Sequence, residues 1–240
     1  MTAAAPTVAS APASAAAYGF HAPRVARVLD RLHRDARRDV FRIALRSPLL
    51  AADMFGWRRA DPARLSHRTR DIYFPVSREQ GQFLYLMARS IGARRIVEFG
   101  TSFGISTLYL AAAVRDNGGG AVIGSELEPS KHARASEHLR EAGLDDIASV
   151  RLGDAQATLA DVAAPLDLVL LDGWKDGYLP ILHLLTPKLR AGALVLADNI
   201  YTFKRALRPY VEYVQSGQYG FVSTTLDLAD GFELSVYTGP

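Results

Sequence analysis

Three oxygen-bearing side chains follow two short apolar runs of the sequence. Asp172 comes directly after the run at 166–171, and Asp198 and Asn199 follow the run at 193–197. Two carboxylates and an amide, with water molecules completing six ligands, suit Mg²⁺ or a similar hard cation. No His or Cys stands beside them, which argues against zinc. The alternative, that each side chain caps the turn after its strand, explains one such residue better than it explains three.

A glycine-rich turn and two acidic residues indicate a nucleoside ligand. The turn at 98–104 has the spacing G-x-x-x-G, which is neither the dinucleotide pattern G-x-G-x-x-G nor a phosphate loop with its lysine. Glu126 follows about 25 positions later, where a carboxylate can accept hydrogen bonds from ribose hydroxyls. Asp154 can accept a hydrogen bond from an adenine amino group or cap a helix. These residues fit adenosine and a nicotinamide dinucleotide equally well.

The elements that must position these residues alternate along the chain. Strands are predicted at 95–99, 121–126, 149–152, 166–171 and 193–197, and helices at 78–91, 105–114, 129–142, 178–189 and 203–214. This alternation predicts an α/β fold with a Rossmann-like, doubly wound, mostly parallel sheet of seven strands. Gly192 is expected to end the helix at 178–189. The strands at 221–225 and 232–237 have no helix between them, which predicts a C-terminal antiparallel hairpin. Ligands of such sheets bind beyond the carboxyl ends of the strands, where the acidic residues fall.

Together these segments resemble the cation-dependent O-methyltransferases of the catechol and caffeoyl-CoA type, which are class I enzymes that use S-adenosylmethionine. The resemblance covers residues 72–240. It rests on Glu126 and on the motifs V-E-F-G-T-S-F-G-I-S (97–106), L-D-G-W-K-D-G-Y-L-P (171–180), L-A-D-N (196–199) and D-G-F-E-L-S-V-Y-T-G-P (230–240).

The resemblance implies a cofactor site for S-adenosylmethionine. Val76, Gly100 and Ser106 would hold the methionine part, and Glu126 would bind the ribose. The full set of residues expected at the cofactor is Val76, Glu98, Gly100, Ser106, Glu126, Leu127, Asp154, Ala155, Gln156, Asp172 and Trp174. Within this set, residues 154–156 would line the adenine pocket, and Trp174 would flank both cofactor and substrate.

The resemblance also implies that Asp172, Asp198 and Asn199 hold the divalent cation and that Lys175 is the general base. Elementary chemistry agrees, because a phenolic hydroxyl titrates near pH 10 and little oxyanion exists at neutral pH. A cation bound to both vicinal oxygens of the acceptor stabilises the anion, and its field lowers the pKa of a nearby lysine. The alternative for Lys175 is a solvated surface lysine.

The sequence departs from the catechol enzymes around the acceptor. Thr224 stands where the family has a second acid that holds the other hydroxyl, and Gly173 replaces a histidine. Ile72 and Phe203 fall near the positions of the aromatic and proline walls of the acceptor pocket. We therefore expect the chemistry to be shared and leave the acceptor and its regiochemistry open.

Other functions remain as alternatives. A nicotinamide-dependent oxidoreductase is disfavoured by the glycine spacing and the acidic trio. An RNA-directed methyltransferase, recruited through an Arg-rich helix, would usually carry an Asn/Asp-Pro-Pro-aromatic motif where this chain has Asp172-Gly173-Trp174. A metal-independent small-molecule methyltransferase of the same fold stays open. A non-catalytic adenosine-binding module is disfavoured by the presence of Lys175 and Asp172.

The charge divides the chain into three predicted segments. Residues 1–20 form an uncharged Ala/Pro-rich tail, expected to be disordered and not a secretory signal. Residues 21–70, with 13 Arg against 5 Asp, form an Arg-rich helical extension with a helix over 23–46; its arginines face solvent, a dimer partner or the substrate entrance. Residues 71–240 carry a net charge of −5 and form the methyltransferase domain.

The composition narrows the setting further. The absence of cysteine excludes disulfides and a thiol nucleophile. No run approaches the roughly 20 apolar residues needed to span a bilayer. We expect a cytoplasmic homodimer that acts on a small aromatic hydroxylated substrate, with no nucleic-acid or membrane partner.

Overall fold

The computed structural model describes residues 18–38, 67, 70 and 76–239. The predicted helix over 23–46 is confirmed for 23–38, and the rest of it lies outside the described residues. Residues 1–17 of the predicted tail and Ile72 also lie outside them.

Helices and strands alternate from residue 78 onward, as the sequence predicts. The strands are β1 (Arg95–Phe99), β2 (Ala121–Glu126), β3 (Ala148–Leu152), β4 (Leu166–Leu171), β5 (Leu189–Ala197), β6 (Phe221–Leu226) and β7 (Phe232–Tyr237). The α-helices are α3 (Arg78–Ser90), α4 (Ile105–Asp116), α5 (Pro129–Ala142), α6 (Ala155–Thr158), α7 (Tyr178–Leu185) and α8 (Lys204–Gln215). Short 3-10 helices are η2 (Gly19–His21), η3 (Lys175–Gly177) and η4 (Thr186–Lys188).

The predicted end of the helix at 178–189 is wrong. α7 ends at Leu185 and continues as the 3-10 turn η4, because Pro187 has no N–H to extend the α-helical hydrogen bonds. β5 then begins at Leu189, so Gly192 lies within a strand. Its φ of 76° accompanies a register shift between β4 and β5, so the glycine marks a strand irregularity instead of a helix end.

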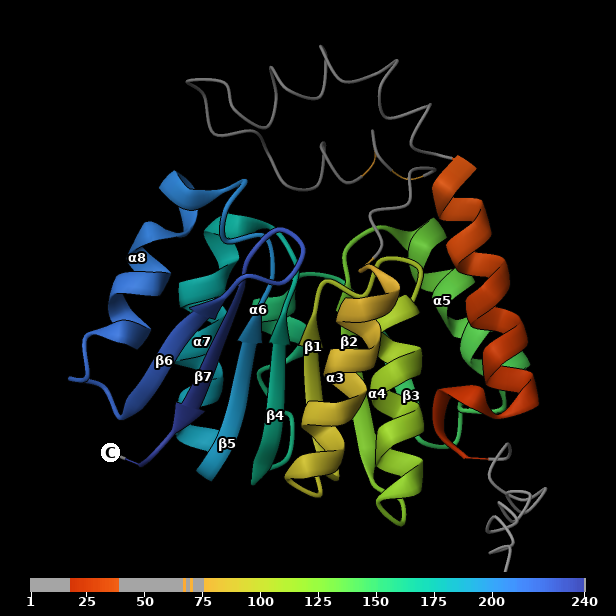
Figure 1. The fold of residues 1–240 in the computed structure, drawn as a ribbon, viewed down its shortest axis with the longest axis horizontal. Helices are drawn as coiled ribbons and strands as arrows, with labels where there is room; N and C mark the ends of the chain where they lie inside the picture. The colour runs from red at the N-terminus through yellow and green to blue at the C-terminus, as the bar shows by residue number, and fades with distance from the viewer. Residues whose placement is uncertain (1–17, 39–66, 68–69, 71–75, 240) are drawn as a thin grey trace, which may run out of the picture.

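The strands form one mixed sheet in the order β3-β2-β1-β4-β5-β7-β6 (Figure 1). β1 to β5 pair in parallel, and β7 pairs antiparallel with both β5 and β6. The predicted doubly wound sheet and its C-terminal hairpin are therefore confirmed. Because the parallel strands share one direction, the loops that follow them gather at the same edge of the sheet, the upper edge in Figure 1.

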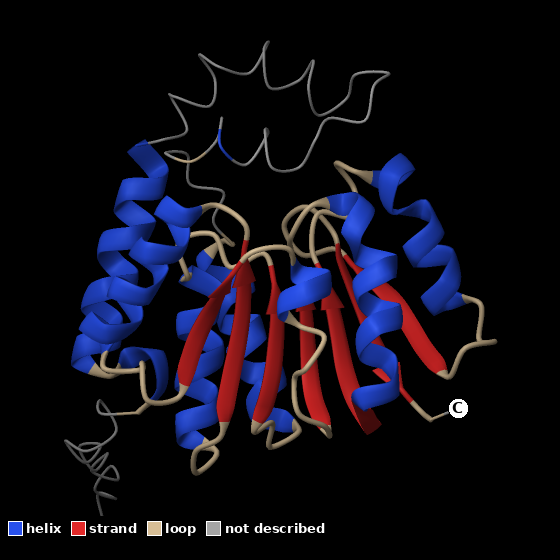
Figure 2. Cartoon of the chain, turned by 180° about the vertical axis from the view of Figure 1, so that it is seen from behind, coloured by secondary structure: helices blue, strands red, loops and turns tan. Residues whose placement is uncertain are grey.

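Apolar side chains bury both faces of the sheet. Figure 2 shows the sheet and the helices that cover it from behind. One cluster joins α3, α4, α5 and the helix at 23–38 to the sheet, and includes Leu32, Leu84 and Leu108. The other joins α6, α7 and α8 to the opposite face, and includes Leu182 and Leu207. This burial removes the apolar sides of the helices from water and stabilises the layers. Within the described residues, none of the helices is both long and apolar enough to cross a membrane.

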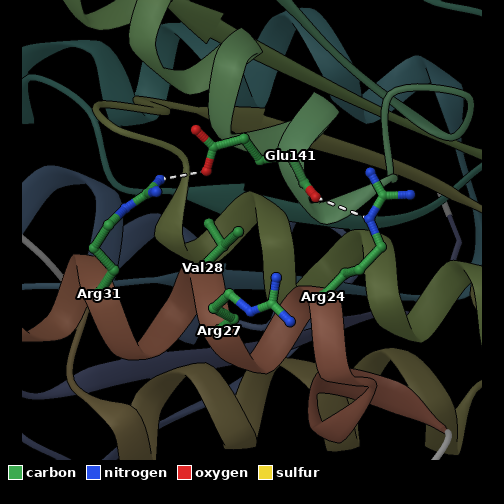
Figure 3. A pocket seen from close by; sticks show the side chains of 5 residues that line it. All are labelled: Arg24, Arg27, Val28, Arg31 and Glu141. Atoms are coloured by element: carbon green, nitrogen blue, oxygen red, sulfur yellow. Dashed lines mark hydrogen bonds and ion pairs between the residues drawn. The ribbon is translucent and has the colours of Figure 1, made fainter.

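The N-terminal helix is attached to the C-terminal end of α5 by two arginines (Figure 3). Arg24 donates to the backbone oxygens of Arg140 and Glu141, at 3.1 and 3.0 Å, and Arg31 pairs with the Glu141 carboxylate at 2.6 Å. Cationic groups are favourable at a helix C-terminus, where the last carbonyls lack intrahelical partners. These two arginines thus make intramolecular contacts that the sequence did not predict.

Candidate active site

The end of β1 carries a buried carboxylate with one unsatisfied oxygen. Glu98 is fully buried, and its Oε2 accepts hydrogen bonds from the hydroxyls of Thr101 and Thr107. Burial raises the pKa of Glu98, against a smaller opposing effect of the neighbouring hydroxyls. Glu98 Oε1 and Ser102 Oγ are buried with no hydrogen-bond partner among the described residues. Buried polar atoms are normally satisfied, so these two atoms indicate room for a polar ligand.

The turn after β1 requires glycine because it approaches another backbone. Gly100 has a φ of 96°, and a Cβ built on it would lie 2.5 Å from the Cα of Gly173 in the turn after β4. The turn ends at Gly104, which begins α4 without a side-chain cap. The first amides of α4 are therefore open to an anionic group. Ser106, in the first turn of α4, and Val76 are both buried, and their contact with a cofactor stays a prediction.

Glu126 ends β2 and is held by two backbone amides. Its Oε2 accepts from Ser102 N at 2.7 Å, and its Oε1 accepts from Glu128 N at 2.8 Å. Each carboxylate oxygen can accept a further hydrogen bond. The side chain is thus fixed beside the glycine turn, and its contact with a ribose stays a prediction. Leu127 follows it and is half-buried.

Asp154 caps α6, so the helix-cap interpretation of this residue is confirmed. Its carboxylate accepts from Gln156 N at 2.8 Å. Ala155 is buried, whereas Asp154 and Gln156 are exposed at the loop after β3. A cap uses one carboxylate oxygen, so an adenine contact through the other oxygen stays a prediction.

Asp172 and Asp198 follow the neighbouring strands β4 and β5, whose ends pair Leu171 with Ala197. Burial and the charge of Asp198 hold the pKa of Asp172 well above its usual range. Burial also raises the pKa of Asp198, although several hydrogen bonds and Lys175 oppose the shift. Two neighbouring carboxylates whose pKa values are both raised in a buried place mark a position where a cation would be stabilised.

Lys175 lies inside this acidic site. Its Nζ donates to Asn199 Oδ1 at 2.6 Å and to the Tyr178 hydroxyl at 2.9 Å, and lies 3.8 Å from Asp172 Oδ1. Burial lowers the pKa of the ammonium, while the charge of Asp172 opposes that shift. The interpretation of Lys175 as a solvated surface residue is therefore wrong.

Asn199 adopts a left-handed backbone with a φ of 66° and donates its N–H to Asp198 Oδ1 at 2.7 Å. Asparagine tolerates this conformation better than most residues. The turn aims the amide oxygen at Lys175. Trp174 lies half-buried immediately before Lys175, and the Phe203 ring centroid is 5.4 Å from Nζ.

Three further residues belong to this site and were missed in the sequence. Gln80 donates from Nε2 to Asp198 Oδ1 at 2.8 Å, and the Tyr178 hydroxyl donates to Asp198 O at 3.1 Å. Asp230, in the β6–β7 turn, is close enough to act on the charges of Lys175 and Asp198. The sequence did show Ser77 and Gln80 at capping-box spacing, but it held no signal that Gln80 also reaches Asp198.

No group of three His, Cys, Asp or Glu side chains that could hold a metal occurs in the described part of the chain. The predicted cation ligands Asp172, Asp198 and Asn199 are two carboxylates and an amide, so they do not form a group of this kind. Thr224 is exposed on β6 and offers no carboxylate at this position.

The chain is similar to known methyltransferases in sequence. A family described as "Methyltransferase domain" matches residues 97–200. A catechol O-methyltransferase of Mycobacterium tuberculosis is 38% identical over 127 residues, which cover 52% of this chain and 56% of the relative. The catechol O-methyltransferase of Mus musculus is 29% identical over 178 residues, which cover 69% of this chain and 66% of the relative. The chain thus spans between about half and two thirds of the length of these relatives.

Solved structures extend the likeness to most of the chain. The O-methyltransferase TomG from Streptomyces achromogenes, solved in complex with S-adenosylmethionine, superposes with a TM-score of 0.66 at 27% identity. The match covers 87% of this chain and 99% of TomG.

Proposed function

The chain belongs to the S-adenosylmethionine-dependent methyltransferase family that includes the catechol and caffeoyl-CoA O-methyltransferases, and on that premise we propose that it methylates a hydroxyl of a small catechol-like aromatic. S-adenosylmethionine would be the methyl donor, and a divalent cation, with Mg²⁺ the first choice, would orient the acceptor oxygens. The observation that carries this proposal is the buried contact of Lys175 with Asn199 and Asp172, beside Asp198 and next to the glycine turn.

The cofactor fits the polar atoms that the protein leaves unsatisfied. Within the described part of the chain, Glu98 Oε1 and Ser102 Oγ lie buried without hydrogen-bond partners, and the first turn of α4 has no side-chain cap and could receive the carboxylate of a methionine moiety. Glu126 is already oriented by two amides and retains acceptor capacity for a ribose. Val76, Gly100 and Ser106 would complete the methionine end, and residues 154–156 with Leu127 the adenosine end.

The cation fits the donor chemistry of Asp172, Asp198 and Asn199. The two carboxylates supply negative charge in a buried place, and the amide oxygen can accept from Lys175 and still bind an ion through its second lone pair. When bound there, a divalent cation stabilises the oxyanion of a vicinal diol and fixes both oxygens.

Lys175 would take the proton from the acceptor hydroxyl. Its neutral form is favoured by burial, and Asn199 and Tyr178 hold Nζ in one orientation. The acceptor oxygen would then take the methyl group of S-adenosylmethionine, with S-adenosylhomocysteine as the leaving group and the proton held on Lys175. Because the methyl group is already activated, alignment is the main contribution of the protein.

A metal-independent methyltransferase of the same fold is the second candidate function. The observation in its favour is the 2.6 Å hydrogen bond from Lys175 Nζ to Asn199 Oδ1, which places an ammonium group at a proposed cation ligand. In this alternative the ammonium itself would stabilise the oxyanion. Homodimer formation and a cytoplasmic location are further proposals that rest on the sequence.

One experiment separates these functions. Catechols, flavonoids and hydroxybenzoates are incubated with the full chain and S-adenosylmethionine, with either MgCl₂ or excess EDTA. We expect methylation of a vicinal diol that EDTA abolishes and MgCl₂ restores. We also expect Asp172→Ala to lose it, while Asp227→Ala, at an exposed position, retains it. Full activity in EDTA would refute the requirement for a divalent cation. If no vicinal diol is methylated, the proposed class of acceptor is wrong.

A further inference from the structure

Gln80 joins the start of α3 to the candidate cation site. It is 4% exposed and lies in the first turn of the helix, 118 positions before its partner Asp198. Its side-chain oxygen accepts from Ser77 N at 2.7 Å, and its Nε2 donates to Asp198 Oδ1 at 2.8 Å. One amide therefore completes a helix cap and contacts a proposed cation ligand.

The cap fixes which way the amide points. Ser77 N–H can only donate, so the Gln80 atom that faces it must be the carbonyl oxygen. The NH₂ group is then directed at Asp198. A glutamate would serve the capping box equally well, but it would place a third carboxylate against Asp198. The contact with Asp198, and not the helix cap, therefore requires an amide at position 80.

The carboxylate of Asp198 accepts its hydrogen bonds through one of its two oxygens. Oδ1 accepts from Gln80 Nε2 and from Asn199 N, at 2.8 and 2.7 Å. Among the described residues, none donates to Oδ2. The carboxylate is therefore held in a single rotation, with one oxygen occupied and the other left for a ligand.

We propose that Gln80 is a positioning residue that orients Asp198 so that its Oδ2 binds the divalent cation. This inference rests on the cation-dependent function proposed above. Groups that hydrogen-bond a metal ligand tune affinity, and their removal typically weakens metal binding by about 10- to 100-fold. We expect a loss of about tenfold when Gln80 is replaced, because Asn199 N still holds Oδ1.

The test measures cation binding directly. MgCl₂, and in parallel MnCl₂, is titrated calorimetrically into the full chain saturated with S-adenosylhomocysteine, so that no turnover occurs. The variant Gln80→Met keeps the side-chain length and removes the amide, with both its carbonyl oxygen and its NH₂ group. Ser77→Ala is the matched control, because it removes the other half of the capping box, the bond from Gln80 N to Ser77 Oγ, and leaves the Asp198 contact in place.

The expected result is a Mg²⁺ dissociation constant about tenfold higher for Gln80→Met and unchanged for Ser77→Ala. With the cation at saturation, the kcat of Gln80→Met should return toward that of the wild type. Equal dissociation constants in Gln80→Met and the wild type would overturn the positioning role and leave the proposed function standing. Absence of Mg²⁺ and Mn²⁺ binding in the wild type would overturn both.

If Gln80→Met does not fold, Gln80→Glu supplies the test, because it retains the cap oxygen. Its new carboxylate repels Asp198 in the cation-free protein, so we expect a lower melting temperature without MgCl₂ and a larger rise on adding MgCl₂ than in the wild type. Gln82→Glu adds the same charge at an exposed position two residues along α3 and should behave as the wild type. Identical behaviour of the two glutamate variants would overturn the inference.

Discussion

The buried histidine of the N-terminal helix should make the stability of the protein depend on pH. His33 is 5% exposed, and its Nε2 lies 3.3 Å from the Tyr109 hydroxyl on α4. Burial, with the charges of Arg78 and Arg37, lowers the pKa of His33 from 6.5 to about 4. The folded protein therefore favours the neutral ring. The stabilisation is present above pH 6.5 and is lost as the pH falls towards about 4.

The size of the effect follows from this shift. One pKa unit corresponds to about 1.4 kcal/mol, so the complete loss is about 3 kcal/mol, of which about 2 kcal/mol falls between pH 7 and pH 5. Urea unfolding at both pH values gives the free energies of unfolding. His33→Gln, whose side chain does not titrate, should lose about 2 kcal/mol less than the wild type over this interval.

The same replacement at an exposed histidine is the matched control. His21→Gln should keep the full pH dependence of the wild type, because His21 lies exposed in η2. Parallel losses of stability in the wild type and His33→Gln would refute the reasoning. They would also indicate that the helix at 23–38 does not pack on the domain in solution.

Two further changes separate catalysis from stability. Lys175→Ala should lower the rate of methyl transfer by about 10²- to 10⁴-fold and leave S-adenosylmethionine binding intact by calorimetry, because the general base is lost; an unchanged rate would contradict this role. Glu233 is fully buried on β7 and accepts from Gln215, Ser223 and Thr225. Glu233→Leu should lower the free energy of unfolding by about 2–4 kcal/mol, because these donors lose their acceptor; a loss as small as that of an exposed Thr224→Ala would show that the network contributes little.

The elements themselves could be predicted because their signals are local. β1, β2, β4, β7 and α5 begin and end at the predicted residues. α5 starts at Pro129, which lacks the N–H that a first turn leaves unused, and its C-cap is Gly143 with a φ of 68°. The wrong prediction that Gly192 ends a helix also has a local cause. A glycine with positive φ can end a helix or distort a strand, and the residue type alone does not distinguish the two.

The order of the sheet could be predicted only in part. The lack of a helix between 221–225 and 232–237 indicated a hairpin, but not which of its strands joins the parallel sheet. In the structure β7 pairs with β5, which places the β6–β7 turn and Asp230 beside Lys175. Whether β6 or β7 pairs with β5 depends on which strand has a face that fits the core. The residues that make those contacts are far apart in the sequence.

The sequence by itself determined the parallel α/β architecture and the chemistry available at the strand ends. Apolar runs of four to six residues bounded by turns set the strands, and each acid that follows a strand must lie at the shared carboxyl edge. The tertiary structure decided what those side chains contact. The burial of Lys175 among Asn199, Tyr178 and Asp172, and the hydrogen bond from Gln80 to Asp198, arise when α3, α7 and two strand ends pack together. Such contacts join residues that share no local pattern, because packing in three dimensions and not spacing along the chain brings them within hydrogen-bonding distance.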